Sequence, residues 1–184
     1  MAKVKPFAFI HIPKTAGSSM KTVLPGVGFS HIRYLDLSPE QKESFVFAFV
    51  RNPLDRLLSG WLFNKGNYRV FTHFEEAKNQ FNEFVGRFKV NIEVNYRTGK
   101  HIIPQHWWVA NEAGYVGVDF LGHYETLDED FKIVANHIGV KPNLPKTHIN
   151  KTKHRHYYHY YTPESEAKVR EVYRKDFELF YGGV

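Results

Sequence analysis

The sequence predicts a single α/β domain over residues 1–184, with a mainly parallel central sheet flanked by helices. Two apolar runs, at residues 5–12 and 45–50, each lead directly into a segment with helical spacing of apolar residues. The second run, FVFAFV, is continuously apolar, as expected of a central parallel strand covered on both faces. Such sheets bind ligands at the carboxyl ends of their strands, so a site is expected where these two runs end.

The first half of the chain is predicted to alternate between strands and helices. The apolar runs are assigned as strands, and a further short strand is expected between them, at residues 29–35. Apolar residues recur at helical spacing over residues 18–24 and again over residues 54–63. The order strand, loop, helix therefore occurs at least twice.

The second half is predicted to be mostly helical. Helices are expected over residues 74–88 and 127–138, with a strand or hairpin over residues 115–124 between them. A cap signal at Thr162-Pro163-Glu164 begins a final helix that runs to about Phe180. Elements that bind an acceptor are expected within residues 64–105, where the pattern is least regular.

Composition narrows the classes of function. The chain has no cysteine, which excludes disulfides, zinc ribbons and thiol catalysis. Its formal charge of +6 favours anionic partners such as nucleotides, sulfated or phosphorylated ligands, nucleic acid and anionic membranes. The N-terminal apolar run is broken by His11 and Pro13, too early for a signal peptide or a membrane span. A soluble, cytoplasmic protein is therefore expected.

The loop after the first strand has the composition of a phosphate cradle. A lysine, small residues and hydroxyls offer backbone N–H groups and side-chain donors at one point, from Lys14, Thr15, Ala16, Gly17, Ser18 and Ser19. It differs from the nucleotide triphosphatase loop because no glycine precedes the lysine. An ordinary strand-to-helix turn with a serine cap is the alternative interpretation.

A second candidate site follows the strand at residues 45–50. Arg51 at the strand end and Ser59 on the next helix are predicted to bind one phosphate, the arginine through its bidentate guanidinium. For Arg56, a role in ligand binding and an ion pair with Asp55 or another carboxylate are equally good interpretations.

These two segments, PKTAGSS and RNPLDRLLS, resemble the 5′-phosphosulfate loop and the 3′-phosphate-binding strand and helix of sulfotransferases that use 3′-phosphoadenosine 5′-phosphosulfate (PAPS). FIHIPKTAGSS and FVRNPLDRLLSGW are more similar to the Golgi carbohydrate branch and its heparan sulfate 2-O-sulfotransferase relatives than to the cytosolic phenol and steroid branch. The resemblance continues through GHYETLDEDF, NKTKHRHYYHYY and the final FELFYG. It implies a P-loop-like three-layer fold, PAPS as donor, PAP as product and no metal.

The resemblance also implies roles for individual residues. Lys14 would neutralise charge on the bridging oxygen of the leaving group, and the loop after it would hold the 5′-phosphate. Arg51 and Ser59 would hold the 3′-phosphate. Lys153 and Arg155 belong to a basic run that would fold over the nucleotide, although a solvated charge run is an equally good interpretation.

Transfer to a hydroxyl also needs a proton acceptor, and histidine suits that task near neutral pH. His31 falls where heparan sulfate 2-O-sulfotransferases carry a glycine-histidine catalytic segment, with Ser30 here in place of the glycine. We therefore predict His31 as the base, against the alternative of a structural histidine. His11 is the second candidate, and its position inside the first strand favours bracing the loop.

The acceptor is left open as a hydroxyl of a sugar, a glycan or a phenol. Golgi relatives carry a membrane anchor and often disulfides, and this chain has neither, so a small soluble bacterial or viral form is expected. Four aromatic residues are candidates for stacking on a flat ring: Trp61, Phe63, Trp107 and Trp108.

Two other functions are compatible with the composition. A kinase-like phosphotransferase using the Lys14 loop would need magnesium and an acidic ligand at a strand end, where this chain has Arg51. A basic nucleic-acid module would explain the charge and the aromatic, basic segment before Thr162, but it would not depend on a 3′-phosphate. No nucleic-acid or membrane partner is therefore predicted.

Overall fold

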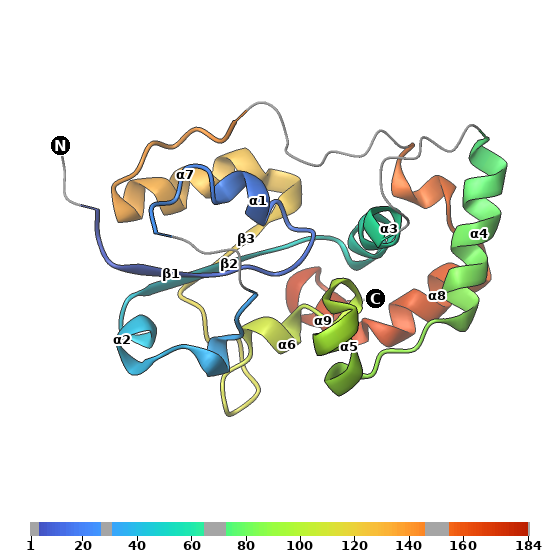
Figure 1. Ribbon diagram of the computed structural model, residues 1–184, viewed down its shortest axis with the longest axis horizontal. Coiled ribbons are helices and arrows are strands. Elements are labelled where there is room, and N and C mark those ends of the chain that lie inside the picture. The colour runs from blue at the N-terminus through green and yellow to red at the C-terminus, as the bar shows by residue number, and fades with distance from the viewer. Residues whose placement is uncertain (1–3, 27–30, 65–72, 146–154, 184) are drawn as a thin grey trace. The chain divides into compact units, whose positions relative to one another are not determined.

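The computed structural model describes residues 4–26, 31–64, 73–145 and 155–183 (Figure 1). The chain divides into two compact units. The first comprises residues 1–51 and 105–150, and the second comprises residues 52–104 and 151–184. The first unit contains the sheet, and the second is built from helices.

The sheet of the first unit has three parallel strands in the order β1-β2-β3. They are β1 (Phe7–Ile10), β2 (Phe45–Val50) and β3 (Phe120–His123). Phe7 pairs with Phe45, and Phe47 pairs with Phe120, so β2 is the central strand. Its continuous apolar run is buried on both faces. The predicted α/β class with a parallel sheet is confirmed.

Helices cover both faces of this sheet. On one face lie α1 (Gly17–Met20) and α7 (Leu127–Ile138), and on the other lies α2 (Pro39–Lys42) (Figure 1). Phenylalanines of β1 and β2 pack against apolar residues in and next to α1 and α7. Together they form one core cluster: Phe9, Met20, Leu24, Phe47, Phe49, Leu127, Phe131, Val134, Ala135 and Ile138. The unit also contains α6 (His106–Val109) and the short 3-10 helices η1 (Tyr34–Asp36) and η3 (Tyr124–Thr126).

The second unit is a helical cluster. It contains α3 (Pro53–Asn64), α4 (Phe74–Arg87), α5 (Ile92–Thr98), η2 (Lys100–Ile102), η4 (Tyr157–His159), α8 (Pro163–Val172) and α9 (Arg174–Phe180). Its core is lined by leucines of α3, by Val169 of α8 and by aromatic residues of α4 and α9. The buried Tyr161 hydroxyl donates to the Leu54 carbonyl at 2.8 Å, which fixes the chain before α8 against the start of α3.

Three predicted elements differ from the structure. In the expected strand at 29–35, residues 29–30 lie outside the described residues, and the rest is irregular until η1, where Arg33 forms an ion pair with Asp36. The first helix is one turn, not seven residues. The final helix breaks at Tyr173, whose buried ring donates through its hydroxyl to the Ile102 carbonyl at 2.6 Å.

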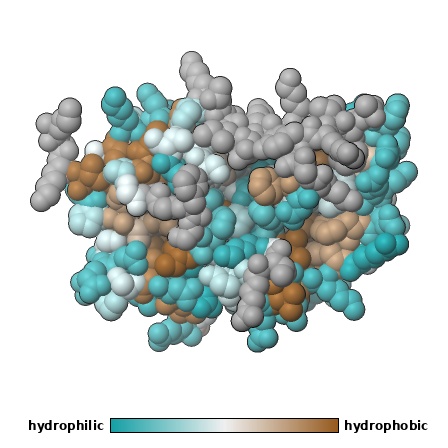
Figure 2. Space-filling model, viewed as in Figure 1, coloured by the Kyte–Doolittle hydropathy of each residue, from teal (hydrophilic) through white to brown (hydrophobic). Residues whose placement is uncertain are grey.

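Figure 2 shows the hydropathy of the described surface residues on one side of the protein. Hydrophilic residues predominate there among the described residues, and apolar ones form small patches. Across the described part of the chain, no helix combines the length and the apolar character needed to cross a bilayer.

Candidate active site

The loop between β1 and α1 has an unusual backbone. Lys14 has a φ of 71° and Ala16 a φ of 65°, both in the left-handed region that non-glycine residues rarely adopt. Each such residue costs about 1–3 kcal/mol and persists only where the surroundings enforce it, typically at functional sites. Thr15 lies between them and is fully buried, and its hydroxyl donates to the Ile12 carbonyl at 2.9 Å.

This backbone leaves a row of amides for a ligand. Within the described residues, the backbone N–H groups of Ala16, Gly17 and Ser18 donate to no protein acceptor. The N–H of Ser19, by contrast, donates to the Ala16 carbonyl at 2.9 Å, which begins the helical hydrogen bonding. Three consecutive N–H groups in a loop with left-handed residues form the concave nest that binds anions. Because α1 is a single turn, these amides matter more here than a helix dipole.

Lys14 adds a cation beside these amides. Burial, and then the positive charge of Arg51, lower the pKa of the Lys14 ammonium to about 8. A buried cation that lies next to a second cation is stabilised when an anion binds between or beside them. The loop therefore has the electrostatics of an anion site.

Arg51 follows β2 directly and reaches the same loop. Its guanidinium donates to the Lys14 carbonyl at 3.2 Å and lies over the Tyr124 ring, 4.1 Å from the ring centroid. Arg51 is buried, so this cation too lies in a place of low dielectric. The structure thus brings Lys14 and Arg51 together at the carboxyl ends of neighbouring strands, as the sequence predicts.

Gln105 was not found by sequence reasoning. Its side chain is fully buried, with 0% exposed. Its Oε1 accepts from the Arg51 N–H at 2.8 Å, and its Nε2 donates to the Arg51 carbonyl at 2.8 Å. Nothing local in the sequence signals this pairing, because Gln105 and Arg51 meet only after the first unit has folded.

His31 lies in the same unit and has a defined tautomer. Its Nδ1 is 2.7 Å from the His11 carbonyl oxygen, which can only accept, so Nδ1 carries the proton. In the neutral ring the lone pair is then on Nε2, which is the nitrogen able to accept a proton from a substrate. The His31 ring is 4.2 Å from the His11 ring and packs edge-on against Trp108 at 5.9 Å between centroids.

The remaining predicted residues belong to the second unit. Ser59 is buried on α3, and Arg155 stacks on Phe74 at 4.4 Å, both within the second unit. Lys153 lies outside the described residues. The phosphate-binding roles of Ser59, Lys153 and Arg155 stay predictions.

Several side chains considered as ligands are structural. Arg56 is buried and donates to the carbonyls of His101 and Ile103, which ties α3 to η2 and explains its place in the motif. The expected aromatic stack is wrong for two of its members, because Trp61 and Trp108 are buried in the core. Trp107 is covered on its ring by the Arg33 guanidinium, 4.6 Å from the centroid.

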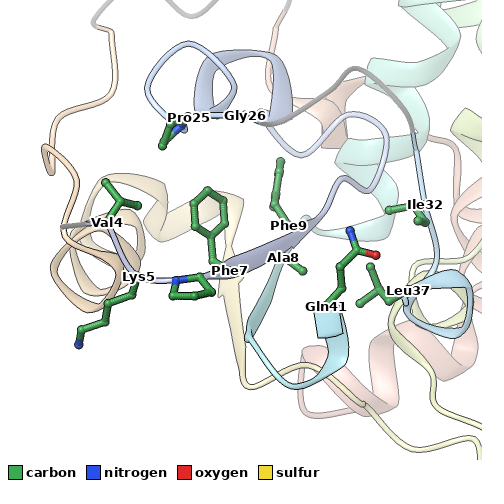
Figure 3. A pocket seen from close by; sticks show the side chains of 11 residues that line it. Val4, Lys5, Phe7, Ala8, Phe9, Pro25, Gly26, Ile32, Leu37 and Gln41 are labelled. Carbon is green, nitrogen blue, oxygen red and sulfur yellow. The ribbon is translucent and has the colours of Figure 1, made fainter. Parts of the chain in front are cut away.

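A cavity of about 440 Å³ lies elsewhere in the first unit, along β1 (Figure 3). Its walls come from residues 4–9, from Pro25 and Gly26 across the strand, and from Ile32, Leu37 and Gln41. Neither the Lys14 loop nor Arg51 contributes to its lining, so this cavity is separate from the candidate site.

Comparison with known proteins gives one match. The family model described as "Sulfotransferase family" matches residues 29–182, which is most of the chain. That range includes His31, Arg51 and Gln105, and it begins after the Lys14 loop. No curated protein and no solved structure matches the chain. On the strength of the family match, the chain belongs to the sulfotransferase family.

Proposed function

We propose that this chain transfers a sulfuryl group from PAPS to a hydroxyl of a sugar, a glycan or a phenol, by in-line displacement with His31 as base. The observation that carries the proposal is the cradle of three backbone N–H groups, at Ala16, Gly17 and Ser18, flanked by Lys14 and Arg51. A donor with a 5′-phosphosulfate and a 3′-phosphate carries the negative charges that these two neighbouring cations and the N–H groups would bind.

The residues of the cradle would divide the donor between them. The N–H groups would bind the 5′-phosphate, and Arg51 would bind the 3′-phosphate together with Ser59. Lys14 would stabilise the negative charge that develops on the leaving oxygen. PAPS supplies the sulfuryl group when it is bound, and PAP is then the product.

His31 would accept the proton of the acceptor hydroxyl at Nε2. The hydrogen bond from Nδ1 to the His11 carbonyl fixes this tautomer before substrate arrives, so no ring rotation or proton exchange is needed. After transfer, the positive imidazolium keeps its Nδ1 donor bonded to the same carbonyl. The arrangement therefore suits both protonation states.

We also propose that the two compact units act as one sulfotransferase domain over residues 1–184. The support is that the family match runs through the chain segments of both units, from residue 29 to residue 182. The acceptor would be a small molecule or a glycan.

Donor specificity is tested first by thermal stabilisation. A ligand that binds only the folded protein raises the melting temperature, and at equal concentration a tighter ligand raises it more. We expect PAP to raise the melting temperature more than AMP or ATP at equal concentration, because only PAP carries the 3′-phosphate. Equal shifts from the three nucleotides would contradict the assignment of the donor.

The base is tested by His31→Ala. We expect transfer from PAPS to fall by about 10²–10⁴-fold, the usual contribution of a general base, while PAP binding stays near the wild-type value. His137→Ala is the matched control, because His137 is exposed on α7 and stacks on Phe45, away from the Lys14 loop. Near-normal transfer in His31→Ala would move the base role to another group.

The acceptor is identified by measuring transfer from PAPS to a panel of monosaccharides, glycan fragments and phenols.

A further inference from the structure

His11 occupies the position between the anion cradle and the proposed base. It follows β1, is 7% exposed, and contacts both Gly17 and His31. Phe9 supports its ring from the sheet, at 5.7 Å between centroids and nearly parallel.

The contact with Gly17 is very close. A Cβ placed on Gly17 would lie 1.9 Å from Cδ2 and 2.1 Å from Nε2 of His11. The imidazole therefore rests directly on the Cα of Gly17, where no larger residue fits beside it. Gly17 carries the middle of the three N–H groups, so the position of these groups depends on the His11 ring.

The contact with His31 has two parts. The backbone carbonyl of His11 accepts the Nδ1 hydrogen of His31 at 2.7 Å, and the two rings lie 4.2 Å apart at an angle of 35°. The carbonyl selects the tautomer, and the ring limits the directions in which the His31 ring can tilt. One residue thus bears on the orientation of the base as well as on the loop.

We propose that His11 is a positioning residue that holds the Lys14 loop and His31 in one arrangement. This inference rests on the proposed function, because its readouts are PAP binding and sulfuryl transfer. His11 does not touch the reacting atoms in this proposal. Its ring acts as a spacer between Gly17 and His31. Without the ring, the Lys14 loop can move toward the space it filled and the His31 ring can change its orientation, so donor binding and proton acceptance change together.

A double-mutant cycle tests the contact with Gly17. We expect Gly17→Ala alone to weaken PAP binding by about tenfold or more, because the new methyl group displaces the His11 ring. In a His11→Ala background the same methyl group has room, and we expect it to cost less than about threefold. Equal costs of Gly17→Ala in the two backgrounds would overturn the proposed contact.

The transfer rate tests the role in positioning. We expect His11→Ala to lower kcat by about 10–100-fold, because a misplacement of about 1 Å is enough for such a loss, and also to raise the Kd for PAP. His11→Phe keeps a ring against Gly17 without imidazole nitrogens, and we expect it to recover most of kcat. A purely structural role would lower the melting temperature of His11→Ala and leave kcat of the folded fraction unchanged, which would overturn the proposal.

The outcomes separate this inference from the function on which it rests. If the wild-type protein neither binds PAP nor transfers sulfate, the proposed function fails. If it does both and His11→Ala behaves like His137→Ala, only the role of His11 fails. If His11→Phe is as inactive as His11→Ala, the imidazole nitrogens are required, and a spacer role is wrong.

Discussion

The two halves of the candidate donor site are held in different ways. The loop after β1 offers backbone N–H groups, and its shape comes from left-handed residues and a glycine under the His11 ring. The end of β2 offers one buried side chain, and its place comes from a side-chain amide that pairs with the Arg51 backbone. The first half therefore depends on conformation, and the second on a single guanidinium and its support.

The difference predicts which substitutions each half tolerates. In the loop, a change matters when it alters φ or the space beside Gly17, and less when it removes a hydroxyl. At the strand end, the identity of the side chain decides the function. Nucleotide binding, unfolding by urea and the pH dependence of binding test this contrast.

Arg51→Ala is expected to have the largest effect on donor binding. Loss of a buried, charge-assisted partner of a phosphate costs about 2–3 kcal/mol, so the Kd for PAP should rise by about 30–150-fold. AMP lacks the 3′-phosphate, so its weaker binding should change much less. Calorimetric titration of both nucleotides measures the difference. A similar loss for AMP and PAP would place Arg51 at the 5′ side and break the comparison.

Gln105→Ala is expected to act on stability more than on binding. The change leaves the N–H and carbonyl of Arg51 buried without their partner, which should lower the free energy of unfolding by about 2–4 kcal/mol. Urea unfolding measures it. Gln80→Ala is the matched control, because Gln80 is on the surface of α4 and its amide donates to the exposed Glu76 carboxylate. Should Gln105→Ala match that control, the amide pairing would not support Arg51.

The pH dependence of PAP binding is the smallest expected effect and reports on Lys14. Burial and the charge of Arg51 lower the pKa of Lys14 to about 8 before nucleotide binds, and a bound anion raises it because the ammonium gains an opposite charge. Affinity should therefore be constant between about pH 7 and the free pKa, and fall by up to about tenfold per pH unit above it. Lys14→Met should flatten this curve over the same range. A wild-type affinity that does not change up to pH 10 would contradict the burial of Lys14.

Local sequence pattern predicted the elements whose cause is local. The continuous apolar run of β2 and the helix over residues 127–138 were both predicted correctly. The cap at Thr162 is also present, as a capping box with Ser165. A site was expected at the carboxyl ends of the parallel strands, and Lys14 and Arg51 lie together there. These features need no knowledge of distant contacts.

The features that the sequence did not predict depend on contacts between residues that are distant in the sequence. The break between α8 and α9 follows from Tyr173 bonding to Ile102, which is far away in the sequence. Gln105 is one polar residue in a mixed segment, and only its partner gives it meaning. The tautomer of His31 likewise depends on the His11 carbonyl. A pattern of apolar spacing carries no information on such pairs.

The Gln105 amide takes the place that a peptide group of a further strand would have beside Arg51. A side chain at position 105 needs a donor and an acceptor in one plane to make these two bonds, and it must be long enough to bring both to the Arg51 backbone. Glutamate lacks the donor, leucine lacks both, and asparagine is one methylene shorter. Since the bonds go to backbone atoms, the requirement does not depend on the side chain at position 51. Natural variation among related chains should therefore leave glutamine at position 105 even where the arginine is replaced, which makes the amide a marker of the fold and the guanidinium a marker of the donor.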